Sequence, residues 1–123
     1  MPGYELIGKE EQKEIDSIFK NGNGVLFRHG FENIRNNSNK VLEFERNFAK
    51  LVGSKYALAV TSGTAALRVA LASLNIKKGD EVITQAFTFV ATVESIVESG
   101  ATPVCTEIDK TLNMDPDDLL KKI

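Results

Sequence analysis

Four small polar residues in mid-chain, Thr61-Ser62-Gly63-Thr64, have the types and spacing to bind an anion. They follow the apolar run 56–60 and lead into the mostly apolar stretch 65–72, a pattern typical of a strand, a tight turn and a helix. The first N–H groups of a helix have no acceptor within the helix, and the helix dipole favours negative charge beside them. A glycine there lets the backbone approach a ligand closely. The turn therefore predicts a phosphate site, although a plain serine or threonine N-cap would show the same pattern.

A second candidate is the pair of aromatic residues Phe87 and Phe89, which follow the predicted strand 81–84. Ligands of parallel α/β sheets gather where the strands end, and a flat ligand there would stack on an aromatic face. The alternative is that both rings pack in the core at the start of a helix. The local pattern favours that alternative.

The remaining polar candidates are better explained by structure than by chemistry. Glu94 and Glu98 lie four residues apart on a predicted helix, which is typical of a solvated face. Asp109-Lys110 follows a predicted strand and is interpreted as a turn, since nothing apolar surrounds the lysine to lower its pKa. Cys105 lies inside that strand and is expected to be a small core residue. The single histidine, His29, has no second histidine with which to bind a metal, and no metal site is expected.

Composition indicates one ordinary globular domain. The chain has 123 residues, 42% of them hydrophobic, and a formal net charge of -2. A slightly acidic chain lacks the basic face that non-specific binding to nucleic acid or an anionic membrane requires. No stretch approaches the roughly 20 apolar residues of a membrane span, and the N-terminus does not have the order of a signal peptide. We therefore expect a cytoplasmic location.

Hydrophobic periodicity predicts alternating helices and strands and hence an α/β fold with a parallel sheet. Helices are expected at about 10–21, 39–52, 64–74 and 88–99, with a last one opened by Asp115-Pro116, and strands at 56–60, 81–84 and 102–108. The helix at 64–74 is apolar nearly all round and should be buried on most faces. Residues 1–9 are expected to form an irregular arm. Residues 25–38 are expected to form a loop that packs its aromatic side chains, or alternatively a segment that contacts a partner.

Taken together, seven motifs resemble the DegT/DnrJ/EryC1/StrS family, whose members are pyridoxal-phosphate-dependent aminotransferases of fold type I. The motifs occur in the family's order and at fitting spacings: Phe44-Glu45-Arg46-Asn47-Phe48-Ala49, Gly53-Ser54-Lys55-Tyr56-Ala57, Thr61-Ser62-Gly63-Thr64-Ala65-Ala66-Leu67, Gly79-Asp80-Glu81-Val82-Ile83, Phe87-Thr88-Phe89-Val90-Ala91-Thr92, Gly100-Ala101-Thr102-Pro103-Val104 and Leu112-Asn113-Met114-Asp115-Pro116. The resemblance implies the N-terminal part of a three-layer αβα large domain, which would be incomplete in this chain. It places this part at residues 41–123, after an N-terminal helix and irregular arm at residues 1–40. It also implies that the strand 56–60 lies apart from the other two, with strands from later in the family's chain between them.

The resemblance assigns four cofactor-binding residues. Gly63, Thr64 and Ala65 match the turn that holds the phosphate of pyridoxal 5'-phosphate, and Phe89 matches the aromatic residue that stacks on its ring. The lysine that forms the Schiff base and the acid that pairs with the pyridine nitrogen lie, in the family, beyond the matched motifs. Asp109 and Lys110 do not correspond to them, so no catalytic residue is assigned.

The implied function is the N-terminal portion of an aminotransferase. Such an enzyme would transfer an amino group from glutamate or glutamine to a keto-sugar, often linked to a nucleotide, in surface-polysaccharide or amino-sugar biosynthesis. The resemblance implies a homodimer with small-molecule substrates, and no nucleic-acid or membrane partner. Because the matched residues include no Schiff-base lysine, the chain alone is expected to be inactive. Two alternatives stay open: a non-catalytic module that binds a phosphate or nucleotide, and a module that pairs with full-length subunits.

Overall fold

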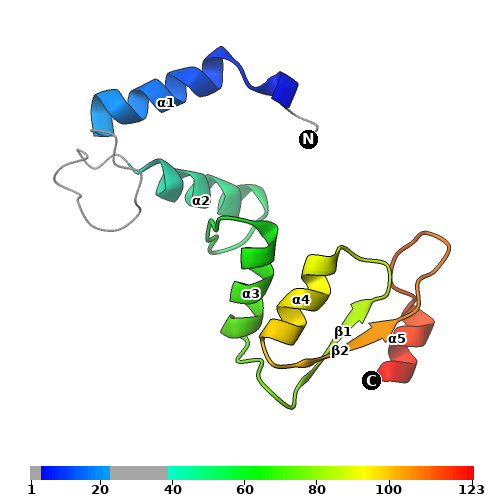
Figure 1. Cartoon of the computed structure of the whole chain (residues 1–123). Coiled ribbons are helices and arrows are strands. Elements are labelled where there is room, and N and C mark those ends of the chain that lie inside the picture. Colours follow the sequence, from blue (N-terminus) through cyan, green and yellow to red (C-terminus); the bar gives the residue numbers. More distant parts are fainter. Residues whose placement is uncertain (1–3, 23–38) are drawn as a thin grey trace. The chain divides into compact units, whose positions relative to one another are not determined.

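The computed structural model describes residues 4–22 and 39–123 (Figure 1). It forms two compact units, Met1–Ala59 and Val60–Ile123. The loop expected at residues 25–38 lies outside the described residues. The predicted boundary between an N-terminal arm, residues 1–40, and the start of the large domain, residues 41–123, stays a prediction. The two compact units of this chain do not test how the large domain of the whole family fold is divided.

In the first unit, the described residues form helices as their regular structure. The arm begins with a short 3-10 helix, η1 (Tyr4–Leu6), followed by α1 (Lys9–Gly22) and α2 (Lys40–Leu51), and both α-helices were predicted. Asn39 is the N-cap of α2, where its side-chain oxygen accepts a hydrogen bond from the Leu42 N–H at 3.1 Å. Gly53, with a φ of 69°, has the left-handed conformation that commonly follows a helix end.

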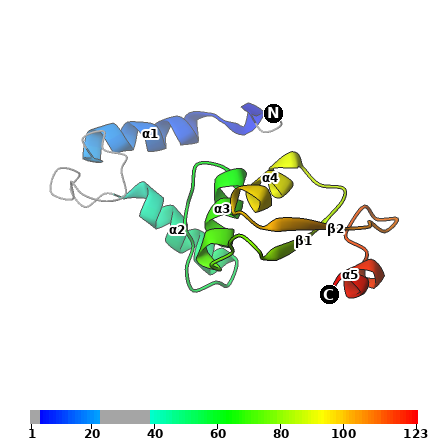
Figure 2. The same cartoon turned by 60° about the horizontal axis from the view of Figure 1, so that its bottom comes forward.

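The second unit alternates helices with two parallel strands. Its elements are α3 (Gly63–Ser73), β1 (Glu81–Gln85), α4 (Val90–Glu98), β2 (Thr102–Thr106) and α5 (Pro116–Lys122). In the register of the pair, Glu81 lies opposite Thr102 and Gln85 lies opposite Thr106. Figures 1 and 2 show α4 and α5 on opposite sides of the two strands. The predicted α/β class with parallel strands is confirmed.

The core of this second unit lies where α4 packs on the strands. Ala91, Ile96 and Ala101 are its buried apolar residues, and Ser95 and Thr106 are almost completely enclosed. The Ser95 hydroxyl donates to the Ala91 carbonyl at 2.7 Å, so this buried polar group has a partner. Small side chains let the helix approach the strands closely. Since α4 starts directly after β1, this packing sets where its N-terminal end lies.

The predicted strand at 56–60 is not formed among the described residues. A strand needs a hydrogen-bonded neighbour, and β1 and β2 pair with each other instead. The Ala59 N–H donates to Glu45 Oε1 at 2.9 Å, so a side chain of α2 takes the place of a neighbouring strand at this point. Glu45 is itself only 3% exposed.

Two burial predictions are also wrong. No residue of α3 is buried, and Leu67 is 39% and Val69 44% exposed. Within the unit, α4 is the principal helix that packs on α3. One neighbouring helix does not cover the other faces of α3. Cys105 is exposed as well, because the helices that contact β2 do not cover its side chain.

Exposed apolar side chains predict poor stability or self-association of the chain in isolation. In the second unit these side chains are Val60, Leu67, Val69, Leu74, Phe87, Phe89, Val90, Val97, Leu112, Leu120 and Ile123. Sedimentation and thermal unfolding of the purified chain should show association or a broad, weak transition. A cooperative melt of a monomer with sharp, dispersed amide signals would contradict this expectation.

Candidate functional site

The turn before α3 has the backbone geometry of an N-cap. Ser62 is extended, with φ -162° and ψ 164°, and its hydroxyl oxygen accepts a hydrogen bond from the Ala65 N–H at 3.1 Å. The Ser62 carbonyl accepts the first helical hydrogen bond, from the Ala66 N–H at 3.0 Å. The simpler interpretation of this turn, a serine cap, is therefore present in the structure.

The cap leaves part of the helix end available to a ligand. Within the described part of the chain, no group accepts a hydrogen bond from the N–H of Gly63 or of Thr64. A Cβ built on Gly63 would meet no atom within 4 Å, and the backbone there is not left-handed. The fold itself thus does not require glycine at this position. Two N–H donors without an acceptor at a helix N-terminus suit a phosphate, which would compete with Ser62 for the third donor, the Ala65 N–H.

Phe89 presents an uncovered aromatic ring at the start of α4. It is the N-cap residue, has no side-chain capping hydrogen bond, and is 77% exposed. Phe87, on the same loop, is 60% exposed. The alternative that these rings pack in the core is therefore wrong for the described residues, and both rings are accessible to a flat ligand.

Two packed helices carry the turn and the aromatic ring. Helices α3 and α4 contact each other, and in Figure 1 both begin on the side where β1 ends. The Arg68 guanidinium forms a forked ion pair with the Glu98 carboxylate: Nη2 lies 2.6 Å from Oε1, and Nε contacts Oε2. This pair ties the middle of α3 to the last turn of α4. The structure thus brings the residues of the turn and Phe89 to the N-terminal ends of adjacent helices.

The acidic candidates Glu94, Glu98 and Asp109 are not arranged for catalysis. Two of them form structural contacts, and the third is exposed to solvent. Glu98 is paired with Arg68, and Glu94 is exposed. The hydrogen bond from the Thr111 hydroxyl, and then that from its N–H, hold the pKa of Asp109 below its usual range. An ionised carboxylate bound within its own turn is a poor proton donor or acceptor at neutral pH, and the turn interpretation of Asp109-Lys110 is confirmed.

Gln85 was not singled out from the sequence, yet its side chain bonds to the loop between β1 and α4, which carries Phe87 and Phe89. Its side-chain amide donates to the Phe87 carbonyl at 2.6 Å and accepts from the Met114 N–H at 3.1 Å. The only signal available from sequence was a polar residue at the end of a predicted strand, directly before two aromatic residues. Its partner Met114 is 29 residues away, which local patterns do not reveal.

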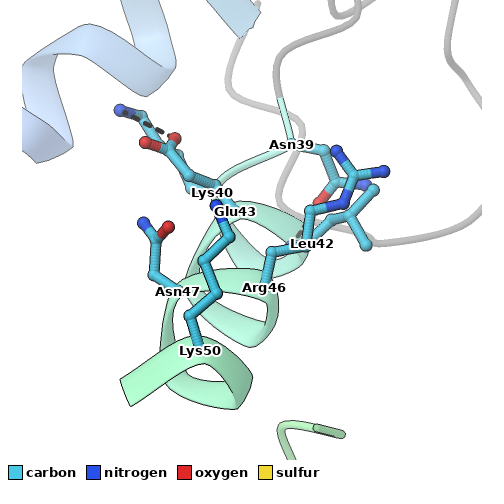
Figure 3. A pocket seen from close by; sticks show the side chains of 7 residues that line it. All are labelled: Asn39, Lys40, Leu42, Glu43, Arg46, Asn47 and Lys50. Atoms are coloured by element: carbon cyan, nitrogen blue, oxygen red, sulfur yellow. Dashed lines mark hydrogen bonds and ion pairs between the residues drawn. The ribbon is translucent and has the colours of Figure 1, made fainter. Parts of the chain in front are cut away.

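A hollow of about 340 Å³ lies along α2 in the first unit (Figure 3). Its walls are Asn39, Lys40, Leu42, Glu43, Arg46, Asn47 and Lys50. All come from one helix and its cap, and Lys40 is already paired with Glu14 at 2.7 Å. The hollow is therefore the charged outer face of a helix, and we assign it no ligand.

Two other features, a metal site and a membrane-spanning helix, are absent from the part of the chain that the structure describes. No group of three or more histidine, cysteine, aspartate or glutamate side chains is arranged to hold a metal ion. None of the helices there has the length and apolar character needed to cross a membrane.

Comparison with known proteins gives consistent matches. The profile of the DegT/DnrJ/EryC1/StrS aminotransferase family matches residues 8–123. The chain is 45% identical over 112 residues to the spore coat polysaccharide biosynthesis protein SpsC of Bacillus subtilis, covering 90% of this chain and 26% of that protein. It is 38% identical over 109 residues to UDP-2-acetamido-2-deoxy-3-oxo-D-glucuronate aminotransferase of Pseudomonas aeruginosa, covering 88% and 30%.

Solved structures agree with these sequence matches. The pyridoxal-phosphate form of the sugar aminotransferase Spr1654 from Streptococcus pneumoniae, itself described as putative, superimposes with a TM-score of 0.80 at 31% identity, covering 95% of this chain and 27% of that one. 3-Amino-5-hydroxybenzoic acid synthase superimposes with a TM-score of 0.85 at 32% identity, covering 99% and 30%. The chain thus has the fold of the N-terminal part of these proteins and spans between a quarter and a third of their length.

Replacing Glu98 by Gln should loosen the last turn of α4, because it removes the charge that Arg68 binds. The pair is about half exposed, with side-chain exposures of 50% and 51%. Exposed pairs contribute about 0.2–1 kcal/mol, so exchange of the amide hydrogens at residues 97–100 should quicken by about 1.5- to 5-fold. Glu94→Gln, on the same helix, is the matched control. Equal effects of the two substitutions would show that the pair does not hold the helices together.

Proposed function

Because the chain belongs to the DegT/DnrJ/EryC1/StrS aminotransferase family, we propose that it forms the phosphate-binding end of a pyridoxal-phosphate-dependent sugar aminotransferase. The whole enzyme would move an amino group from glutamate or glutamine to a keto-sugar, linked to a nucleotide, in surface-polysaccharide or amino-sugar biosynthesis. The relatives support this substrate class. One is named for spore coat polysaccharide biosynthesis, one for a UDP-linked oxo-sugar, and a third is the GDP-perosamine synthase of Vibrio cholerae.

One observation carries the cofactor proposal: the N–H donors of Gly63 and Thr64 have no acceptor among the described residues, and the space where a Cβ of Gly63 would lie is open. Gly63, Thr64 and Ala65 bind the phosphate of pyridoxal 5'-phosphate through backbone N–H groups and the threonine hydroxyl. The positive end of the α3 dipole adds to this attraction. Among solved relatives, Spr1654 is known in a pyridoxal-phosphate and a pyridoxamine-phosphate form.

Phe89 supplies one face for the pyridine ring. Its exposed side chain lies at the start of α4, beside the helix that carries the phosphate turn. Bound pyridoxal phosphate supplies the electron sink of transamination, whereas these residues only bind and orient it. An anchored phosphate and a stacked ring together fix the direction in which the reactive end of the cofactor points.

We also propose that the enzyme is a cytoplasmic homodimer. The exposed apolar side chains of the second unit support an additional contact surface. Small-molecule sugar and amino-acid substrates are its proposed ligands. The chain's slightly negative net charge is consistent with a protein that does not bind nucleic acid.

Binding of pyridoxamine 5'-phosphate tests the site, because this form of the cofactor does not react with surface lysines as the aldehyde does. Gly63→Ala should weaken binding by about tenfold or more, since hydrogen bonds to a charged group contribute about 1.5–3 kcal/mol and we expect the new methyl group to keep the phosphate away from these donors. Phe89→Leu should weaken it by about two- to tenfold, in line with about 0.5–1.5 kcal/mol for an aromatic pair. Titration calorimetry gives both values.

Two matched substitutions control this experiment. Gly8→Ala adds the same methyl group at another glycine with open space around it, and Phe87→Leu makes the same change at the other exposed ring of the loop. Neither should alter binding by more than about twofold. Unchanged affinity of Gly63→Ala, or no preference for pyridoxamine phosphate over pyridoxamine, would refute the phosphate site.

The 123-residue chain alone should not transaminate, because the matched motifs include no lysine that would bond to the cofactor. The assay combines the chain with pyridoxal 5'-phosphate, glutamate and a nucleotide-linked keto-sugar, followed by borohydride reduction and peptide mass spectrometry. We expect no amino-sugar and only scattered modification of surface lysines. Turnover, or a stoichiometric adduct on one lysine, would contradict the expectation. Cofactor binding without turnover is also what a non-catalytic binding module would show, and addition of full-length subunits would then distinguish a pairing module.

A further inference from the structure

We propose that Gln85 is a positioning residue that holds the loop before α4 in the conformation that presents Phe89 to the cofactor ring, an inference that rests on the proposed function. Gln85 is the last residue of β1, and its half-buried side chain contacts backbone groups of two separate segments. None of the four assigned cofactor residues makes these contacts.

Packing does not hold this loop. Both of its aromatic side chains are largely exposed, and Ala86 is exposed between them and the strand. At the start of α4, Phe89 has no side-chain capping bond. Only Thr88 among the loop side chains is half-buried, so hydrogen bonds are the main interactions that oppose the entropy of the free chain.

Four hydrogen bonds hold the loop, and each acts on a different residue. The Phe89 carbonyl accepts from the Thr92 N–H at 3.0 Å, within the first turn of α4. The Ala86 N–H donates to the Thr106 carbonyl at 2.9 Å, which extends the pairing of the two strands. The hydroxyls of Thr88 and Thr92 are 2.9 Å apart and connect the loop to the first turn of α4. Between them, the Phe87 carbonyl accepts from Gln85 Nε2 at 2.6 Å.

Only the Gln85 side chain, among the described groups bonded to this loop, also reaches the segment after β2. Its Oε1 accepts from the N–H of Met114, a residue that forms an antiparallel bridge with Ile108. One amide thus joins two backbone segments, with its donor on one and its acceptor on the other. Glutamate offers no donor at neutral pH, methionine offers neither, and asparagine is one methylene shorter. Of these four side chains, only glutamine therefore offers both the donor and the acceptor at this reach.

Loss of the Gln85 contacts should affect the ring-binding part of the site and not the phosphate-binding part. Gln85 fixes the carbonyl of Phe87, two residues before Phe89, whereas the phosphate turn belongs to α3. Loss of the amide contacts should therefore weaken binding of a ligand with a ring and leave binding of a bare phosphate unchanged. A general loss of folding would weaken both ligands together.

The experiment measures the affinities of the chain for pyridoxamine 5'-phosphate and for inorganic phosphate in Gln85→Met and Gln85→Glu. We expect both variants to bind pyridoxamine phosphate about fivefold more weakly, the usual effect of one lost hydrogen bond, with phosphate affinity within about twofold of the wild type. The same substitutions at Gln12, the chain's other glutamine and an exposed residue of α1, are the matched controls and should change neither affinity.

Hydrogen exchange supplies a readout that needs no ligand. The Met114 amide should exchange about fivefold faster in Gln85→Met and stay protected in Gln85→Glu, which keeps the acceptor. Unchanged exchange in Gln85→Met, or equal weakening of both ligands, overturns the inference while the phosphate site stands. If the unsubstituted chain binds neither ligand, the proposed function fails and this inference fails with it.

Discussion

The second unit depends on the parallel pairing of β1 with β2 under the packed helix α4. Parallel neighbours require a crossover, and in this chain the crossover is α4 itself. The helix must therefore begin where β1 ends, and its first residues lie at the carboxyl edge of the strands. The small buried residues Ala91 and Ser95 keep the helix close to that edge. This constraint puts Phe89 at the carboxyl ends of the strands, where α/β sheets bind ligands. The position of Phe89 follows from the chain connection and not from the chemistry of its ring.

Hydrogen bonds, more than packing, shape the parts of this unit that we propose bind the cofactor. The start of α3 is held by the Ser62 hydroxyl, and the loop before α4 is held by backbone, hydroxyl and amide contacts. Few apolar side chains are buried near either. Polar contacts of this kind leave the surface open to a ligand while keeping donors and rings in fixed directions. That arrangement suits a site that must bind a charged phosphate and a flat ring together.

Exposed apolar surface is the other main feature of the chain. Helix α3 has the composition of a buried helix but no buried residue, and residues 56–60 have the composition of a strand but no strand beside them. In both cases the sequence is suited to neighbours that the described residues do not provide. The chain spans between a quarter and a third of the length of the relatives it matches.

The sequence by itself determined the positions of the five α-helices that the described residues form, of the two strands that pair and of the capped turn at residues 61–64, because caps, glycines and hydrophobic periodicity act over a few residues. The motifs also determined the family. Only the tertiary structure decided that residues 56–60 form no strand, that α3 and Cys105 are exposed, and that Gln85 bonds to Met114. Burial, strand pairing and long-range hydrogen bonds each depend on which residues become neighbours, and a local pattern does not contain that information. The assignment of the cofactor to Gly63, Thr64, Ala65 and Phe89 stays a prediction, which the geometry of two adjacent helix ends supports.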